Sequence, residues 1–525
     1  MIIGTIGSCK RAQVRGGGTI VLREGTLVEI ELAWWVGADD RWHVAERAVT
    51  ARQHLVRDVP VVQTSLRVPG GDAIATAFAT VQGPRELVVI DVENRSKLPF
   101  ALALVLRGPG VRDVTLDGNV VRVAGVPLLY LPRRPQRMAA VPTIKGAPTI
   151  DDIVMSGGAG DSLVRVDGAS SAAFLLPAAH ATTTRCAILV SAGNSAASLG
   201  APVLSALPTI HTVANGWSAQ LQRSVSVKLP DAALGARLTS HAAALLLASE
   251  PVLHDTSSSP LLLATLASAL DRVGFADEAV ALLQEIPDRQ GARGAFAGGD
   301  PVCATAVVVS ALGQHALLSH NSIFAAAMSP TVAGAIEFLA RQLRRDRSQQ
   351  RWSAAVRSAA DVFQIAGDGG AVKQAMRLWE KQGCRWPLPD PPLAELPAAG
   401  RGGSFVPDDP TRLALAAGDL VESVVAMDVD GTVDLLRGFD ESWRGQAIEV
   451  RNVPTSAGQL SYAIRWHGAR PALLWEIEPR PGIVGGEPLR LRASALDPAW
   501  SGDGMRGDAL LATPAPVVDR VVAPG

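Results

Sequence analysis

Residues 86–107 read Glu-Leu-Val-Val-Ile-Asp-Val-Glu-Asn-Arg-Ser-Lys-Leu-Pro-Phe-Ala-Leu-Ala-Leu-Val-Leu-Arg, and this stretch decides the fold of the first part of the chain. It contains two apolar segments of strand length, separated by a polar turn at 95–97. Similar segments with glycine-rich turns precede and follow it, as at 61–81 and 113–130. Because no helical period intervenes, residues 1–230 are predicted to form a large antiparallel β-sandwich.

The pattern of apolar residues changes near Asp231. From there to about residue 385 the apolar residues follow a helical period. Residues that commonly end helices support this interpretation, since Gly274 and Pro287 each follow a predicted helix. Helices joined by short connections indicate an α/α helical-hairpin domain over 231–385. The predicted helices are 233–249, 261–273, 276–286, 302–318, 331–344, 353–366 and 371–382.

The last part of the chain returns to strand patterns. Residues 386–410 are rich in proline and are predicted to be an extended connector. Residues 411–525 are predicted to form a small C-terminal β domain, with strands inside 422–436, 446–450, 459–466, 471–477 and 489–493. The expected fold class is therefore multidomain α+β: an N-terminal antiparallel β-sandwich, a central α/α hairpin domain and a C-terminal β domain.

The charge and the apolar runs of the 525 residues indicate which classes of partner to expect. Lys plus Arg is 49 and Asp plus Glu is 50, so the net charge is -1 and no excess of positive charge is available to hold a nucleic acid. The N-terminus lacks a signal-peptide pattern, and apolar runs such as 242–248 and 260–270 are too short to span a bilayer. We therefore expect a soluble, cytoplasmic protein with no membrane partner. Nothing in the sequence specifies the oligomeric state.

The cysteines do not indicate a metal site. Cys9, Cys186, Cys303 and Cys384 are widely spaced, and none belongs to a Cys-x-x-Cys pair. Small, buried apolar side chains are the simplest interpretation of all four. We expect neither a metal nor another cofactor.

Two stretches resemble a known enzyme family. The first, 274–344, contains Phe275-Ala276-Asp277-Glu278-Ala279 and then Ala311-Leu312-Gly313. The second, 435–476, contains Trp443-Arg444-Gly445 and Ile464-Arg465-Trp466-His467-Gly468. Together with the order of domains, they resemble the six-hairpin (α/α toroid) glycosidases of glucoamylase type. The resemblance implies a partial toroid in a truncated or degenerate relative, with activity toward carbohydrates.

Glycoside cleavage requires two carboxyl groups on either side of the scissile bond, one of them protonated. In alternating helices every second connection lies at the same end, so the connections near 255 and 300 are expected to share one end with those near 350 and 385. Asp255 and Asp300 are the predicted acid/base pair at this end. Helix capping is the alternative role for both, because Asp255 precedes a Ser-rich run and Asp300 stands directly before Pro301.

Four side chains are candidates for contact with a sugar. His254, Trp352 and Trp386 fall on the connections at the same predicted end, and Trp35 belongs to the aromatic and polar cluster at 34–43. Packing is the alternative for the tryptophans. Since Trp34 and Trp35 are adjacent on a strand, they should point to opposite faces, which predicts that one packs inward and the other is free.

Two functions follow from these features. The first is a carbohydrate-active protein that hydrolyses or binds an oligosaccharide or glycoside. The alternative is a non-catalytic pseudo-enzyme or scaffold whose helical array binds a partner protein. Whether the chain is an enzyme depends on the surroundings of Asp255 and Asp300.

Overall fold

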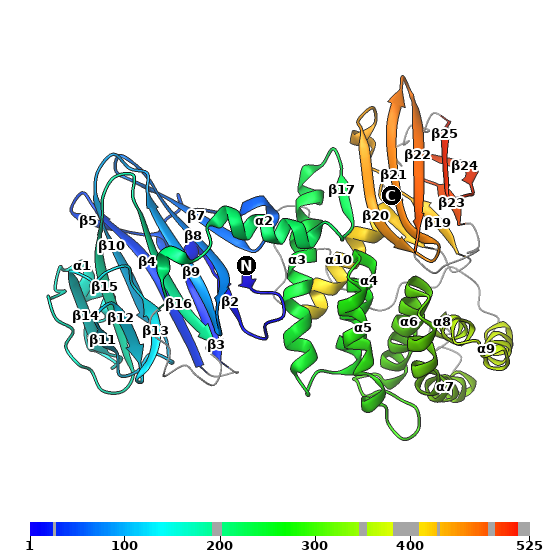
Figure 1. Ribbon diagram of the computed structural model, residues 1–525, viewed down its shortest axis with the longest axis horizontal. Coiled ribbons are helices and arrows are strands. Elements are labelled where there is room, and N and C mark those ends of the chain that lie inside the picture. The colour runs from blue at the N-terminus through cyan, green and yellow to red at the C-terminus, as the bar shows by residue number, and fades with distance from the viewer. Residues whose placement is uncertain are drawn as a thin grey trace, which may run out of the picture. The chain divides into compact units, whose positions relative to one another are not determined.

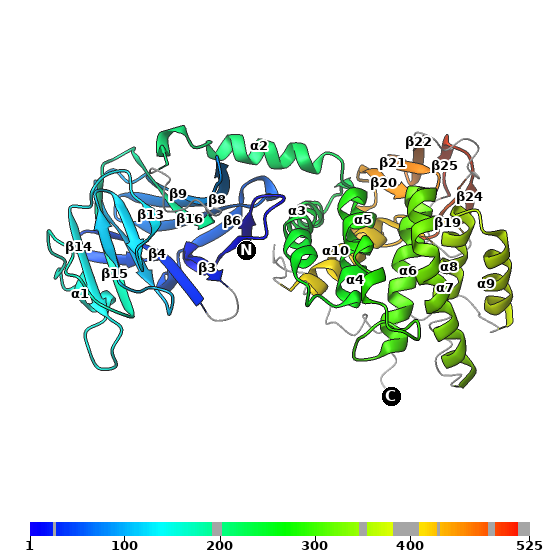
Figure 2. The ribbon, with the colours of Figure 1, turned by 60° about the horizontal axis from the view of Figure 1, so that its bottom comes forward.

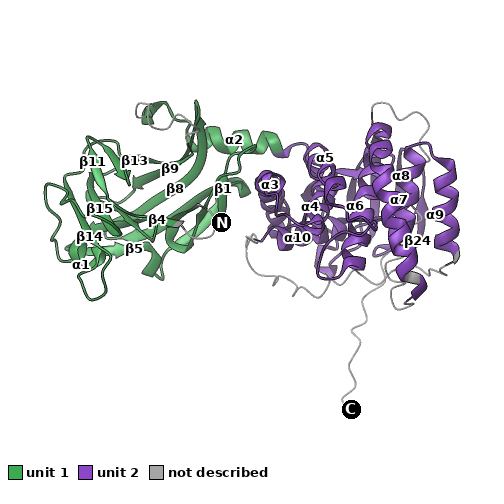
Figure 3. Ribbon diagram, turned by 90° about the horizontal axis from the view of Figure 1, so that it is seen from below, with its two compact units in different colours: residues 1–220 green, residues 221–525 purple. Residues whose placement is uncertain are grey.

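The computed structural model describes residues 1–24, 28–191, 202–345, 354–381, 409–427, 431–480 and 489–512. The chain forms two compact units, Met1–Gln220 and Leu221–Gly525. The first contains antiparallel sheets, and the second contains helices followed by strands (Figures 1 and 3). This is the mixed α+β class predicted from the sequence, with the helical hairpins and the C-terminal strands packed together in one unit.

The first unit is a sandwich of two eight-stranded antiparallel sheets. Residues 86–107 supply one strand to each sheet, because the chain crosses between sheets at the polar turn. The side-chain amide of Asn94 holds this crossing, donating to the carbonyls of Leu98 (2.9 Å) and Ala178 (3.1 Å). One sheet has the order β1 (Ile2–Gly4), β2 (Arg11–Val14), β3 (Ile20–Glu24), β4 (Val28–Ala38), β10 (Phe100–Arg107), β15 (Ser170–Ala178) and β14 (Arg137–Pro142), with β5 (Arg41–Val44) paired to β4. The other has the order β11 (Thr115–Asp117), β12 (Val120–Val123), β13 (Val126–Tyr130), β16 (Thr183–Ser191), β9 (Arg85–Asn94), β8 (Gly71–Gln82), β7 (Val61–Val68) and β6 (Arg52–Leu55).

The core of the first unit lies between these sheets. Trp34 and Phe174 of the first sheet pack there with Ile90 and Ile188 of the second, all at 1% exposure or less. The indole N–H of Trp34 donates to the carbonyl of Gly17 (3.0 Å), which satisfies its polar atom inside the core. Alternation along the strands therefore places one apolar face of each sheet against the other.

Two helices interrupt the region that was expected to contain strands only. The first, α1 (Ile150–Met155), begins with a capping box, in which Thr149 and Asp152 each satisfy the other's backbone N–H. The second, α2 (Ile210–Leu221), ends the first unit. With six residues, α1 is too short for an apolar period to distinguish a helix from a strand, which explains why the sequence pattern missed it.

Helices of the second unit form two layers (Figure 2). In one layer α10 packs against α4, α4 against α6, and α6 against α8. In the other, α3 contacts α5 and α7 contacts α9. The contacts define a layered array, and the partial toroid stays a prediction. The helices are α3 (Ala232–His254), α4 (Pro260–Val273), α5 (Ala276–Gln284), α6 (Pro301–Ser319), α7 (Ser322–Arg345), α8 (Ala354–Ile365), α9 (Gly369–Lys381) and α10 (Pro410–Val424).

The helix α10 corrects the predicted start of the β domain. Asp409 accepts from the N–H of Arg412 (2.8 Å) and Pro410 takes the first helical position, so the segment after the proline-rich stretch begins as a capped helix. Its buried face, which includes Leu413, Ala417 and Val421, packs on α3 and α4.

Strands of the second unit form two sheets. A strand before the helices pairs with one after them, which ties the two ends of the unit together. One sheet has the order β17 (Ser226–Lys228), β20 (Ile448–Thr455), β21 (Gly458–His467), β22 (Arg470–Pro479) and β25 (Arg506–Leu510). The other has the order β18 (Val425–Met427), β19 (Thr432–Leu435), β23 (Arg490–Ala493) and β24 (Asp497–Gly502).

Within the described residues, α6 and the segment Ser322–Gln342 of α7 are long and apolar enough to cross a membrane. About half or more of each segment is buried inside the structure, 61% and 50% respectively. Buried helices of a globular core have the same length and composition, so this observation favours packing within the array.

Asp361 on α8 makes the stability of the second unit depend on pH. Its side chain is 18% exposed and has Arg357 one turn earlier at 4.0 Å. Burial raises the pKa of Asp361 from 3.8 to about 6, against the opposing charge of Arg357. Because this pKa is raised in the folded state, the contribution to stability is complete below the unfolded pKa and is lost as pH rises through about 6.

Asp361→Asn is therefore expected to stabilise the second unit at neutral pH, by at most about 3 kcal/mol, and to have little effect at about pH 4. Urea unfolding of both proteins across this pH range measures the difference. Glu337→Gln is the matched control, because the Glu337 side chain is 71% exposed and should change stability little at any pH. Parallel pH profiles for the parent and Asp361→Asn would contradict the prediction.

Candidate functional site

Two connections between helices meet at one end of the helical array. They join α3 to α4 and α5 to α6, and Arg289 links them: its guanidinium donates to the carbonyl of Ser258 and lies 3.7 Å from the carboxylate of Glu285. The Arg289 side chain is only 16% exposed. The opposite ends of α4 and α6 lie near the strands, where His320 Nε2 is 2.8 Å from the carbonyl of Ser456. The connections α3–α4 and α5–α6 therefore come together at the end of the helical array that is remote from the sheets. We call this end the candidate site.

The connection between α5 and α6 is held against α7. Gln290 donates through its side-chain amide to the carbonyls of Gly294 (3.1 Å) and Thr331 (2.8 Å). Gly294 has a φ of +83°, and a Cβ there would lie 2.0 Å from the carbonyl oxygen of Gly334. Only glycine permits this close approach of two backbones, so the shape of the connection is set by local sequence.

Asp255 ends α3, and its carboxylate is occupied locally. Oδ1 accepts from the backbone N–H of Ser257 (2.9 Å) and from the Ser257 hydroxyl (2.6 Å). These hydrogen bonds, with a smaller effect of the Arg289 charge, lower the pKa of Asp255. A general acid needs a raised pKa so that it holds a proton near neutral pH, and Asp255 has the opposite shift.

Asp300 occupies the N-cap of α6. Its Oδ1 accepts from the N–H of Val302 (2.9 Å), and Pro301 takes the first helical position. This is the capping role that the sequence left open as an alternative. The same hydrogen bond would be made by an asparagine, so it requires no ionised carboxylate.

His254 lies in the last turn of α3 and faces solvent. Its side chain is 58% exposed, with Nδ1 at 3.0 Å from the carbonyl of Glu250 and 3.7 Å from the Glu250 carboxylate. The ion pair of His254 with Glu250, one turn earlier, contributes little to stability because it is partly exposed. The Nε2 side of the His254 ring remains directed toward the surface. His254 therefore shares the end of the array with Asp255 and Arg289.

The predicted tryptophans fall elsewhere. Trp352 and Trp386 lie outside the described residues. Trp35 is fully buried on the outer face of the first sheet, packed with Val105, Ile150 and Val154, so its ring has no surface to offer a sugar. The expectation that either Trp34 or Trp35 is free was wrong, because the second sheet covers one face of β4 and α1 covers the other.

A buried ionisable pair was missed by the sequence analysis. Asp271 on α4 and His315 on α6 are 1% and 3% exposed, and His315 Nδ1 lies 2.9 and 3.1 Å from the two carboxylate oxygens. The signal in the sequence is a charged residue on the apolar face of a helix, since Asp271 follows Ala264 and Ala267 at helical spacing. Enclosed side chains cannot reach a substrate, so the pair fixes the packing of two helices and performs no catalytic step.

In the part of the chain that the structure describes, no group of three or more His, Cys, Asp or Glu side chains is placed to hold a metal ion. The candidate site at the end of the array can offer ionised and hydrogen-bonding groups to a polar ligand, namely Asp255, His254 and the edge of Arg289.

Comparisons with known proteins give similarities to solved structures. No family model matches the chain, and no curated protein matches it. Among solved structures, a bacterial glucoamylase in complex with acarbose is similar with a TM-score of 0.50 and 10% sequence identity. The similarity covers 72% of this chain and 65% of the glucoamylase. A polysaccharide lyase aligns over 73% of this chain with a TM-score of 0.22, which is too low to indicate a shared fold.

The likeness to the glucoamylase concerns the fold. It relates 72% of this chain to the fold of a carbohydrate-active enzyme. The chain spans 65% of the length of that glucoamylase. A shared fold at this identity transfers neither substrate nor catalytic residues.

Proposed function

We propose that this protein binds an oligosaccharide or glycoside on a glucoamylase-like framework, and that Asp255 and Asp300 do not cleave it. The observation that carries the first part is the similarity in fold to a glucoamylase over 72% of the chain. The second part rests on the hydrogen bonds of the two carboxylates.

The chemistry of glycoside cleavage supports the second part. An inverting enzyme needs one protonated and one ionised carboxyl group, each facing the bond to be broken. Asp255 has a lowered pKa and Asp300 caps a helix, so neither has the surroundings of a general acid. Their positions instead stabilise the ends of α3 and α6.

Asp255→Asn and Asp300→Asn are expected to change carbohydrate binding, or any hydrolysis, by less than about twofold, because asparagine accepts the same backbone hydrogen bonds. Asp300→Ala is expected to cost about 1 kcal/mol of stability through the lost cap. Calorimetric titration with neutral oligosaccharides, product analysis with aryl-glycosides and urea unfolding measure the three quantities. A folded Asp300→Asn protein that loses a hydrolytic activity of the parent by a hundredfold would overturn the proposal.

A second candidate is a non-catalytic scaffold whose helical array binds a partner protein. The local hydrogen bonds of Asp255 and Asp300 favour the scaffold as well, because they leave the end of the array without an acid/base pair. Binding of neutral oligosaccharides by the full chain separates the two: it supports the carbohydrate-binding proposal, and its absence across the panel favours the scaffold.

A further inference from the structure

A row of half-buried residues crosses the outer face of the first sheet near the ends of its strands. Trp42, Gly37, Ala101 and Pro177 are neighbours in register on β5, β4, β10 and β15, and each is half-buried. We call these four residues the Trp42 strip. It lies on the same face as Trp35, beside the part that Ile150 and Val154 of α1 cover. Four adjacent strands make the strip roughly 14 Å long, the scale of an oligosaccharide.

The ring of Trp42 lies against the backbone of Gly37. A Cβ at Gly37 would be 3.0 Å from Cζ3, 3.1 Å from Cη2 and 3.2 Å from Cε3 of the ring. Three ring atoms at nearly equal distance indicate that the six-membered ring rests with its face toward the strand. The tryptophan is therefore held by packing while part of it stays exposed, as an aromatic platform requires.

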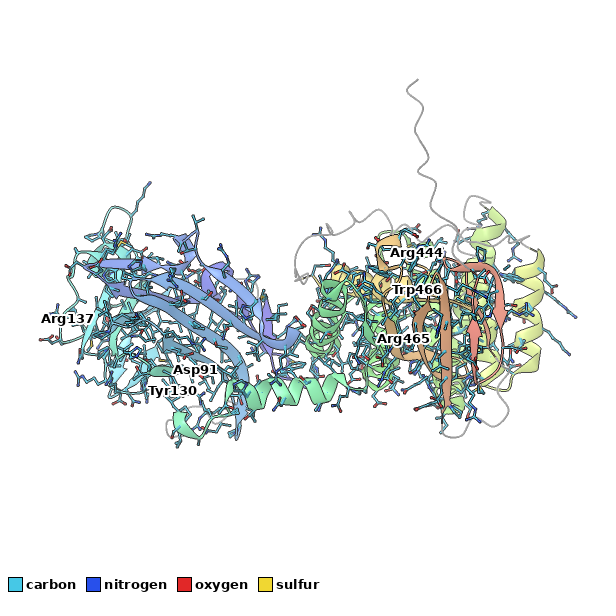
Figure 4. The ribbon with its side chains drawn as sticks, turned by 90° about the horizontal axis from the view of Figure 1, so that it is seen from above. Asp91, Tyr130, Arg137, Arg444, Arg465 and Trp466 are labelled. Atoms are coloured by element: carbon cyan, nitrogen blue, oxygen red, sulfur yellow. The ribbon has the colours of Figure 1, made fainter. Side chains whose placement is uncertain are left out.

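Positive charge gathers at the other end of the strip. Residues 131–149 contain four basic residues and no Asp or Glu. Arg133 donates through Nη2 to the carbonyl of Pro177 (2.7 Å), and Arg137 on β14 is exposed and in register with Leu175 on the same outer face (Figure 4). Among the interactions of the described residues, neither guanidinium has a carboxylate within ion-pair distance. These charges are therefore available to an anionic ligand.

We propose that the Trp42 strip, with Arg133 and Arg137, binds an anionic oligosaccharide: the apolar face of a sugar ring stacks on Trp42, and carboxylate or sulfate groups meet the two arginines. Ala101 and Pro177 lie in register between Trp42 and the two arginines, so a chain of sugars that stacks on Trp42 would cross them. Charge complementarity and the aromatic platform together select an acidic saccharide over a neutral one. This site belongs to the first unit, and it goes beyond the proposed function because it names the surface and the acidic class of the saccharide.

The test uses the full chain and calorimetric titration with three ligands: a hexameric oligogalacturonate, a heparin hexasaccharide and maltohexaose. The expected result is binding of an acidic ligand at least about tenfold tighter than maltohexaose at this site, weakening as salt is added. The preferred acidic ligand distinguishes a carboxylate from a sulfate. Trp42→Ala and Arg137→Gln should each weaken acidic binding about tenfold, and Trp42→Phe should weaken it less.

Arg122→Gln is the matched control, because Arg122 is a partly exposed arginine of the other sheet, 34% exposed. It should change acidic binding less than about twofold. Equal affinity for all three ligands, or unchanged acidic binding by Arg137→Gln, would overturn the proposal, as would equal losses in Arg137→Gln and Arg122→Gln. Maltohexaose binding that Trp42→Ala leaves intact takes place outside the Trp42 strip, so failure here and failure of the proposed function remain distinguishable.

Discussion

Replacing His315 with leucine is expected to lower the free energy of unfolding of the second unit by about 3–5 kcal/mol. His315 and Asp271 are almost completely enclosed, and the imidazole Nδ1 contacts both carboxylate oxygens at 2.9 and 3.1 Å. Leucine fills much of the space but provides no hydrogen-bond donor. The variant then buries a carboxylate without its partner, which is the costly way to break such a pair.

The same substitution should make stability depend more strongly on pH. Burial raises the pKa of Asp271, while His315 and the charges of Arg480 and Arg272 oppose this effect. The rings of Phe324 and His315 pack edge to face with their centroids 4.6 Å apart, and Phe324 adds no charge. Without His315 the opposition weakens, and because a raised folded-state pKa favours the protonated form, stability should fall further as pH rises through it.

A double-mutant cycle provides the control. Asp271→Leu/His315→Leu removes both polar groups, so it should be less destabilised than His315→Leu alone. Urea unfolding that monitors the second unit, at several pH values, measures each term. Destabilisation by the double variant equal to the sum of the single effects would mean that the two side chains do not interact energetically.

Strand and helix periods predicted much of the secondary structure but not how the elements pair. The two apolar segments in 86–107 identify two strands, and the structure contains them as β9 and β10. They lie in opposite sheets, since β9 pairs with β8 and β16 while β10 pairs with β4 and β15. Both strands are buried on both faces, so apolar pattern alone does not distinguish a hairpin from a crossing between sheets.

Helix α10 shows a different limit of the sequence. Its first turn has the capping signal Asp409-Pro410, but it follows a proline-rich stretch, and its small and branched side chains are compatible with either structure. Packing against α3 and α4 decides in favour of the helix. Tertiary contacts that cannot be read from local spacing therefore override an ambiguous local preference.

The sequence predicted which segments come together at the candidate site, but not what the side chains of Asp255 and Asp300 do there. The spacing of connections indicated that Asp255 lies near the connection after α5, and the contact between Arg289 and Ser258 joins those two segments. An aspartate before proline at the start of a helix looks the same in sequence whether it caps or catalyses, and the hydrogen bond to Val302 distinguishes the two. Asp271 and His315, 44 residues apart, could be paired only once the register of α4 and α6 was known.

A second large effect is expected in the first unit from Arg185→Met. Arg185 and Asp91 are directly opposite on β16 and β9, and the guanidinium holds the carboxylate with two hydrogen bonds of 2.7 Å. Asp91 is only 4% exposed, and Figure 4 shows it within the N-terminal unit. Methionine keeps most of the stem but leaves the carboxylate buried and unpaired, so the loss should be about 3–5 kcal/mol.

Arg185 also fixes a neighbouring segment, because its Nη1 donates to the carbonyl of Leu207 (3.1 Å). Hydrogen exchange over 202–207 should therefore accelerate in Arg185→Met along with the loss of stability in urea. Arg185→Lys keeps the charge but loses the two-pronged geometry, so it should fall between the parent and Arg185→Met. Asp91→Leu/Arg185→Met, which buries no charge, should recover part of the stability while exchange at 202–207 stays fast, since the bond to Leu207 is still missing. If exchange in that segment instead matches the parent in every variant, the contact with Leu207 does not hold it.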